Sequence, residues 1–242
     1  MDGSVSATMR PCGDSALTVE FENEISLGTN MKVQALAGRL EKENKRGVGE
    51  LIPAYRSLFI EYDPLALTYG EMKDWVGAHL EGLDATSKGP RAVTEIPVLY
   101  AGEDLEEISA IEGKPVDEII RIHSGSDYFV YMLGFSPGHP YTARFENPFS
   151  FGRRATPRVE IPAGSVVVQL GMSNIIPFDQ PCGWNIIGRT PVRVCDFSRE
   201  RPFLLRSGQW VRYVPVDPEE FRRIRELDAR GGYICKEYLL GP

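Results

Sequence analysis

The sequence is poor in residues that hold metal ions. It has three histidines and four cysteines in 242 residues, and the cysteines, at positions 12, 182, 195 and 235, form no Cys-x-x-Cys pair. A structural zinc site needs closely spaced thiolate or imidazole ligands, so we predict no metal site. The wide spacing also gives no disulfide framework, and we expect reduced thiols in a cytoplasmic protein.

Long apolar runs and a basic surface are missing as well. No run approaches the roughly 20 apolar residues of a membrane-spanning helix. The first residues, MDGSVSATMRPCGDSALTVEF, lack the apolar core of a secretory signal. The formal net charge is −7, whereas a protein that binds the phosphate backbone of a nucleic acid needs a basic face. We therefore expect neither a membrane nor a nucleic acid as a partner.

The first part of the chain has the pattern of a small α+β domain. The spacing of apolar residues predicts strands over 16–21 and 57–62 and helices over 26–44 and 68–83. Strands that alternate with helices through short links favour a sheet with helices on one face. The polar stretch DATSKGPRA that follows is typical of a linker. We therefore expect one domain over 1–90 and a second over 91–242.

The second part has shorter β-rich runs between glycines and prolines. A strand is predicted over 95–100 and short helices over 104–111 and 115–123, with a later helix that starts at Asp217. The later β-rich runs are YFVYML, SVVVQL, NIIG, VRVCDF and QWVRYVPV. Their spacing favours a compact barrel or sandwich over a parallel α/β sheet. The last residues, 231–242, are expected to form a tail or an edge strand.

The segment GFSPG, Gly134 to Gly138, matches the G-x-S-x-G pattern of a hydrolase nucleophile elbow. The elbow's oxyanion hole uses the backbone N–H of the residue after the serine, and here that residue is Pro137, which has none. No histidine follows His139 to complete a triad. The sequence therefore argues against a serine hydrolase. A nucleophilic role for Cys182 is possible through the fold, but a small apolar thiol in a turn is the simpler interpretation.

Three polar loops are the candidate binding site. The first offers Ser136 and His139. The second, RRATPR, offers three arginines with a threonine: Arg153, Arg154, Thr156 and Arg158. The third offers an aromatic wall, Trp184, with the donors Arg189 and Thr190. Guanidinium groups bind carboxylates and phosphates through two oxygens at once, so a polar small molecule is the expected ligand. The same arginines also suit ion pairs with carboxylates, and the tryptophan suits a core.

Five segments resemble one family in their order along the chain. They are GFSPGHPY, RRATPR, IPAGSV, PCGWNIIGRTPVRV and PFLLRSGQWVRYVPV, and they look like the allophanate hydrolase subunit 1 family, also called the carboxyltransferase subdomain C and D family. The likeness is close over residues 95–217 and looser before them. It implies an N-terminal ferredoxin-like α+β domain followed by a cyclophilin-like β-barrel.

The resemblance implies a function in a complex. The family includes the B subunit of prokaryotic 5-oxoprolinase, an enzyme that opens 5-oxoproline to glutamate with ATP. The expected partners are a homologous C subunit, of the allophanate hydrolase subunit 2 type, and an A subunit of the lactam-utilisation type. ATP is then used by the complex, this chain holds no tightly bound cofactor, and the isolated chain need not be active.

Two alternatives stay open. The family also includes the Kip inhibitor of a sporulation histidine kinase, so an inhibitor role is one. The other is the carboxyltransferase subunit of a biotin-dependent urea or amide carboxylase, or of a system associated with allophanate hydrolase. No Met-Lys-Met motif for biotin attachment is present, so biotin would arrive on another subunit.

The loop residues suggest roles in binding, and the resemblance marks departures. The arginines of RRATPR would hold an anionic or phosphorylated group; Ser136, His139 and Thr156 would position it, with Trp184 as a wall and Arg189 and Thr190 as second choices. His139 is the candidate acid–base group, because an ordinary imidazole titrates near neutral pH. The departures from the family pattern are His139 for a phenylalanine, Ala143 and Arg144 for a glycine pair, Met172 for a glutamine and Asn174 for a glycine. They leave the substrate open.

Overall fold

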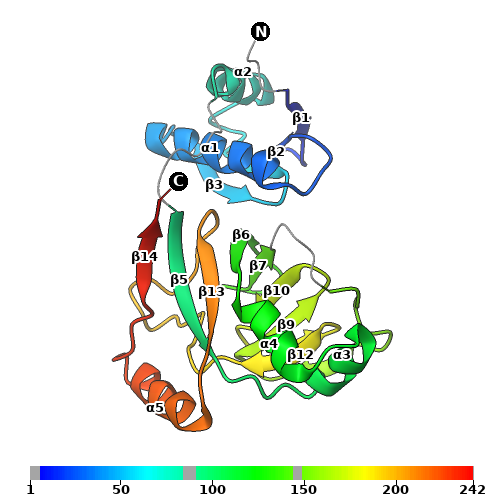
Figure 1. Cartoon of the computed structure of the whole chain (residues 1–242). Helices are drawn as coiled ribbons and strands as arrows, with labels where there is room; N and C mark the ends of the chain where they lie inside the picture. Colours follow the sequence, from blue (N-terminus) through cyan, green and yellow to red (C-terminus); the bar gives the residue numbers. More distant parts are fainter. Residues whose placement is uncertain (1–5, 84–90, 144–148, 242) are drawn as a thin grey trace. The chain divides into compact units, whose positions relative to one another are not determined.

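The chain forms two compact units, Met1–Lys88 and Gly89–Pro242, in the computed structural model (Figure 1). The structure describes residues 6–83, 91–143 and 149–241. The expected domain boundary, at residue 90, lies outside the described residues.

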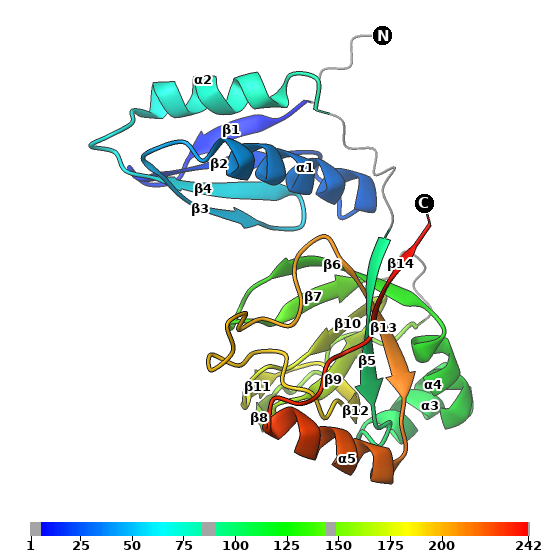
Figure 2. The same cartoon turned by 90° about the vertical axis from the view of Figure 1, so that its left-hand side faces the viewer.

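The first unit is a four-stranded antiparallel sheet with the strand order β1-β2-β4-β3. Its elements are β1 (Thr8–Pro11), β2 (Ala16–Glu20), α1 (Leu27–Glu43), β3 (Val48–Pro53), β4 (Ser57–Tyr62) and α2 (Tyr69–Leu80). This is the arrangement of a ferredoxin-like sheet in which the strand that usually comes last comes first. Both helices bury their apolar faces in one core with β2 and β4 (Figure 2).

Local chemistry explains where the two predicted helices begin. The Ser26 hydroxyl accepts the N–H of Thr29 at the start of α1. Thr68 and Glu71 form a reciprocal capping box at the start of α2. The end of α1 is set by Asn44, which adopts the left-handed conformation at φ 48°. The strands β1 and β3 were not predicted, because both lie at sheet edges and lack alternating burial.

The second unit is built on an eight-stranded sheet with the order β12-β9-β10-β7-β6-β13-β5-β14. Neighbouring strands are antiparallel except β13 and β5. The strands are β5 (Arg91–Val98), β6 (Asp127–Leu133), β7 (Pro140–Ala143), β9 (Ser165–Gln169), β10 (Met172–Ile175), β12 (Asn185–Arg189), β13 (Trp210–Pro215) and β14 (Glu237–Leu240). A separate pair joins β8 (Arg158–Ile161) to β11 (Gln180–Cys182).

The large sheet curls round so that its edge strand β12 meets the chain that follows β5. Leu99, directly after β5, and Arg189, at the end of β12, exchange both backbone hydrogen bonds at 2.9 Å. Farther on, the N–H groups of Gly102 and Asp104 donate to carbonyls of β12 at 3.2 Å. The interior is filled by apolar side chains from both halves of the sheet, such as Ile96 and Val166. The α+β class with a β-barrel that the sequence implied is confirmed.

Among the described residues of this unit, three helices cover the barrel: α3 (Leu105–Glu112), α4 (Val116–Ser124) and α5 (Pro218–Ala229). Figures 1 and 2 show α3 beside α4, with α5 apart from them. Ile108, Ile119 and Ile224 anchor them in the barrel core. Of the described helices, none is long and apolar enough to cross a bilayer.

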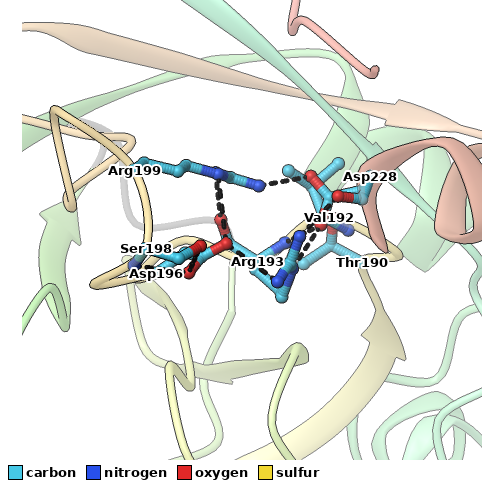
Figure 3. Close-up of polar contacts among 7 residues, drawn as sticks. All are labelled: Thr190, Val192, Arg193, Asp196, Ser198, Arg199 and Asp228. Carbon is cyan, nitrogen blue, oxygen red and sulfur yellow. Dashed lines mark hydrogen bonds and ion pairs between the residues drawn. The ribbon is translucent and has the colours of Figure 1, made fainter. Parts of the chain in front are cut away.

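The long segment between β12 and β13 corrects one prediction. The run VRVCDF, residues 192–197, is not a regular strand; it forms one isolated bridge between Cys195 and Phe203, and its valines pack in the barrel core. Arg193 and Arg199 both donate to the buried carboxylate of Asp228 on α5, at 2.8 and 2.7 Å (Figure 3). This segment is therefore held to α5 by charge, where the sequence pattern indicated a ladder of backbone bonds.

Candidate functional site

The loop GFSPGHPY connects β6 to β7 as a hairpin. The N–H of Gly134 donates to the His139 carbonyl at 3.1 Å, and the His139 N–H donates to the Ser136 carbonyl at 3.1 Å. Gly138 has φ 73° and passes so close to Cys195 that an added Cβ would lie 2.9 Å from that residue's Cβ. A strand follows the serine where an elbow needs a helix, which agrees with the exclusion of a serine hydrolase.

His139 points into the protein and is only 6% exposed. Its Nδ1 lies 3.1 Å from the Gln180 carboxamide and its Nε2 lies 3.2 Å from that of Asn174. The ring stacks on Tyr141 with 5.0 Å between centroids. Burial lowers the pKa of His139 to about 4, because the charged imidazolium is disfavoured away from water. The imidazole is therefore neutral at neutral pH, with both nitrogens engaged.

The two amides tie His139 to its surroundings. Asn174, on β10, accepts the backbone N–H of Thr142 at 3.1 Å through its Oδ1. The carboxamide of Gln180, on β11, lies 2.8 Å from the Ser136 hydroxyl. The structure thus joins Ser136 to His139 through Gln180, a residue outside the set of predicted site residues. No sequence signal could have found this link, because it depends on β7, β10 and β11 meeting in space.

Arg153 lies on the exposed side of this cluster. Its guanidinium passes over Gly183, where an added Cβ would come within 2.4 Å of its Nε. Burial raises the pKa of Tyr141 and of Cys182, and the positive charge of Arg153 opposes that rise in both. No carboxylate forms an ion pair with Arg153 within residues 6–83, 91–143 and 149–241. Its charge is thus available to a ligand as far as these residues are concerned.

Arg154 and Arg158 are engaged differently. Both donate to Oδ1 of the buried Asp104, at 2.8 and 2.6 Å, and each also pairs with a glutamate, Glu107 or Glu103. The other oxygen of Asp104 accepts the N–H of Ile186 on β12 at 2.6 Å. Three carboxylates therefore face these two guanidinium groups. Anion binding at Arg154 and Arg158 stays a prediction, and in this structure they brace β8 and the preceding loop against the start of α3.

The remaining predicted residues are spread around the barrel. Thr156 is exposed, and half-buried Trp184 packs against the small apolar cluster of Ile161, Val167, Ile176 and Ile186. Arg189 donates from Nε to the Ala163 carbonyl at 2.9 Å. The Thr190 hydroxyl accepts the Val192 N–H at 3.3 Å. Arg144 lies outside the described residues, and Met172 occupies the β10 position opposite Ala143.

Taken together, the described side chains offer neutral donors and one guanidinium rather than a metal centre. No group of three or more His, Cys, Asp or Glu residues is placed to hold a metal ion in the described parts of the chain. The cluster of Ser136, His139, Gln180, Tyr141 and Arg153 suits a small molecule rich in hydrogen-bond acceptors.

The fold and this set of loops define a carboxyltransferase-type barrel with an α+β partner unit. Residues 7–205 match the family model described as carboxyltransferase domain, subdomain C and D, so the chain belongs to that family. It is 34% identical to the 5-oxoprolinase B subunit of Bacillus subtilis over 227 residues, which cover 88% of this chain and 95% of the relative. It is 33% identical to the 5-oxoprolinase B subunit of Escherichia coli O157:H7 over 209 residues, which cover 84% of this chain and 93% of the relative.

Solved structures agree. The crystal structure of TTHA0988 matches with a TM-score of 0.76 and 35% identity over 87% of this chain. The match covers 40% of the TTHA0988 chain, so this chain spans less than half of that protein. The urea amidolyase of K. lactis matches with a TM-score of 0.77 over 100% of this chain and 17% of its own, at 19% identity. That last likeness shows the fold alone.

Proposed function

We propose that this chain is the B subunit of a prokaryotic 5-oxoprolinase-type complex. In this proposal the complex hydrolyses 5-oxoproline to glutamate with ATP, and the chain acts beside a homologous C subunit and a lactam-utilisation type A subunit. One observation carries it: three bacterial proteins named as the B subunit of 5-oxoprolinase are 30 to 34% identical to the chain and are covered over 93 to 95% of their lengths. A match of that extent leaves little of either protein unaligned.

The geometry supports a binding role for this subunit. 5-Oxoproline carries a carboxylate and a lactam carbonyl, both of which accept hydrogen bonds. Ser136 and Arg153 offer matching donors on the barrel. Behind Ser136 lies the buried His139, held by the side-chain amides of Asn174 and Gln180. In this proposal ATP is used by the complex, and this chain holds no tightly bound cofactor.

Reconstitution tests the proposal. The chain is expressed with the A-type and C-type partner proteins encoded beside it, and glutamate release from 5-oxoproline is measured with and without ATP. We expect ATP-dependent release that disappears when this chain is left out. A full set that forms no glutamate would overturn the proposed activity.

A second candidate is a carboxyltransferase subunit of a biotin-dependent amide carboxylase. It is favoured by the match to the urea amidolyase of Lachancea kluyveri, which is 25% identical over an alignment of 262 positions. The alignment covers 95% of this chain and 14% of the relative. The same reconstituted set, supplied with carboxybiotin and urea or another amide, distinguishes the two. Transfer of the carboxyl group without 5-oxoproline turnover would favour this candidate.

A further inference from the structure

The hydrogen-bond chain around His139 fixes the direction of every donor in it. The backbone N–H of Thr142 is the starting point, because a peptide N–H can only donate. It donates to Oδ1 of Asn174 at 3.1 Å, so the oxygen of that amide faces Thr142. The Nδ2 of Asn174 then faces Nε2 of His139 at 3.2 Å and donates to it.

His139 must therefore carry its proton on the other nitrogen. A neutral imidazole has one N–H and one acceptor nitrogen, and Nε2 is already the acceptor. The pKa of His139, lowered to about 4 by burial, keeps the ring neutral at physiological pH. Nδ1 then carries the hydrogen and faces the Gln180 carboxamide at 3.1 Å.

The proton on Nδ1 of His139 also fixes the orientation of the Gln180 carboxamide, and through it the hydrogen bond to Ser136. In the structure the Gln180 oxygen accepts the Ser136 hydroxyl at 2.8 Å and the Gln180 NH2 group faces Nδ1 of His139. With the Asn174 NH2 group at Nε2, that arrangement leaves a neutral ring no place for its own hydrogen. The carboxamide must therefore be turned, with its oxygen on Nδ1 of His139 and its NH2 group on the Ser136 hydroxyl. The two ends of a carboxamide fill nearly the same space, so this orientation has no steric cost. In the turned orientation Ser136 accepts from Gln180 over the same 2.8 Å, and no other acceptor for its own proton occurs among the described residues. The hydroxyl proton is left to point at a ligand.

From this chain of contacts we infer that Asn174 and Gln180 lock His139 in the Nδ1–H form, so that Ser136 becomes a donor which, with Arg153, forms a subsite for a carboxylate. The inference rests on the proposed function only for the identity of that carboxylate, 5-oxoproline. Arg153 completes the subsite because its guanidinium passes over Gly183, directly after β11, the strand that carries Gln180. His139, Asn174 and Gln180 are positioning residues, and His139 does not act as the general base.

The tautomer is tested on the full chain alone. In the protein labelled with nitrogen-15 at histidine, long-range proton–nitrogen spectra separate a protonated ring nitrogen from an unprotonated one. The His139 signals are assigned by their loss in His139→Phe. We expect a protonated Nδ1 and an unprotonated Nε2 at pH 7. A protonated Nε2 would overturn the inference, whatever the reconstituted complex does.

The subsite is tested by titration of the same protein with 5-oxoproline and with 5-oxoprolinamide, which lacks the carboxylate. We expect 5-oxoproline to shift the His139 signals and the amide to bind at least tenfold more weakly. Arg153→Gln and Ser136→Ala should each weaken 5-oxoproline binding about tenfold, the loss of roughly one hydrogen bond to a charged group. Equal binding of acid and amide, or no shift with either, would overturn the subsite.

Gln180→Glu gives the sharpest control. A carboxylate at this position accepts from both Nδ1 of His139 and the Ser136 hydroxyl, which withdraws the serine proton from the ligand. We expect Gln180→Glu to weaken 5-oxoproline binding as much as Ser136→Ala does, while Ser136→Thr, which keeps the hydroxyl, binds as the parent chain does. Arg222→Gln, an exposed arginine on α5, serves as the charge control for Arg153→Gln. Full binding by Gln180→Glu would show that Ser136 is not the donor.

Discussion

Arg193 donates from Nε to the buried carboxylate of Asp228 at 2.8 Å. This contact joins the segment after β12 to helix α5, two parts of the barrel unit that are far apart in the sequence (Figure 3). The side chain of Asp228 is 2% exposed, whereas that of Arg193 is 44% exposed. The carboxylate is therefore the group whose desolvation must be offset by its partners, and its hydrogen bond raises the pKa of Arg193.

Asp228→Ala should destabilise the barrel unit. It leaves Arg193 and Arg199 without their shared acceptor at a buried position, and we expect a loss of about 2–3 kcal/mol in the free energy of unfolding. Urea denaturation followed by tryptophan fluorescence measures it. Glu220→Ala, which breaks the exposed pair with Arg223 on the same helix, is the matched control and should cost less than about 1 kcal/mol. Equal losses would show that burial of Asp228 does not matter.

Gly102→Ala should be among the most damaging small substitutions. The chain passes so close to β12 here that an added Cβ would lie 2.2 Å from the carbonyl oxygen of Ile186. The nearest atoms, in Ile186 and Ile187, are all backbone, so the barrel closure would have to open, at a cost of about 3 kcal/mol or more. Gly152→Ala, where nothing lies within 4 Å of the added carbon, should change stability by less than about 1 kcal/mol. A thermal melt of both variants compares them.

Helices were easier to predict than edge strands. The helix over 26–44 is marked by a cap at each end and by apolar residues on one face, and the structure begins and ends it within one residue of that range. By contrast, β1 and β3 gain their order from pairing with β2 and β4, which no local pattern reveals. The run VRVCDF has the composition of a strand, but the contacts of its Arg193, and of Arg199 just after it, with Asp228 hold this segment in a loop.

The site was harder to predict than the fold. The three arginines of RRATPR are neighbours in the chain, which suggested one shared anion site, but the structure gives Arg154 and Arg158 the carboxylate of Asp104, some 50 residues away. Asn174 and Gln180, the two residues that position His139, belong to β10 and β11. They meet His139 only through the pairing of strands. Residue type predicted the donors, and strand topology decided which of them share a site.

The cysteines should differ sharply in reactivity toward a thiol reagent. Cys12 is exposed. Burial raises the pKa of Cys235 to about 12 and also raises that of Cys195, so little reactive thiolate forms at either. We expect one rapid equivalent with iodoacetamide at pH 8 that is absent from Cys12→Ser, and reaction of Cys235 only after unfolding. Rapid labelling of Cys235 in the folded chain, located by peptide mass, would contradict its burial.

His139 should make the chain less stable in mild acid. Its pKa is lowered from 6.5 to about 4 on folding, so the unfolded chain binds the proton more readily than the folded chain does. The stability that neutral His139 supports is thus fully present above about pH 6.5 and is lost as the pH falls toward about 4. The total is about 3 kcal/mol, with a limiting slope of about 1.4 kcal/mol per pH unit. Urea unfolding of the parent chain and of His139→Phe at pH 4.5 to 7.5 measures it, because other groups cancel in the difference. We expect the stability of the parent relative to the variant to decline steadily below pH 6.5, and a constant difference would show that His139 is as easily protonated in the fold as in water.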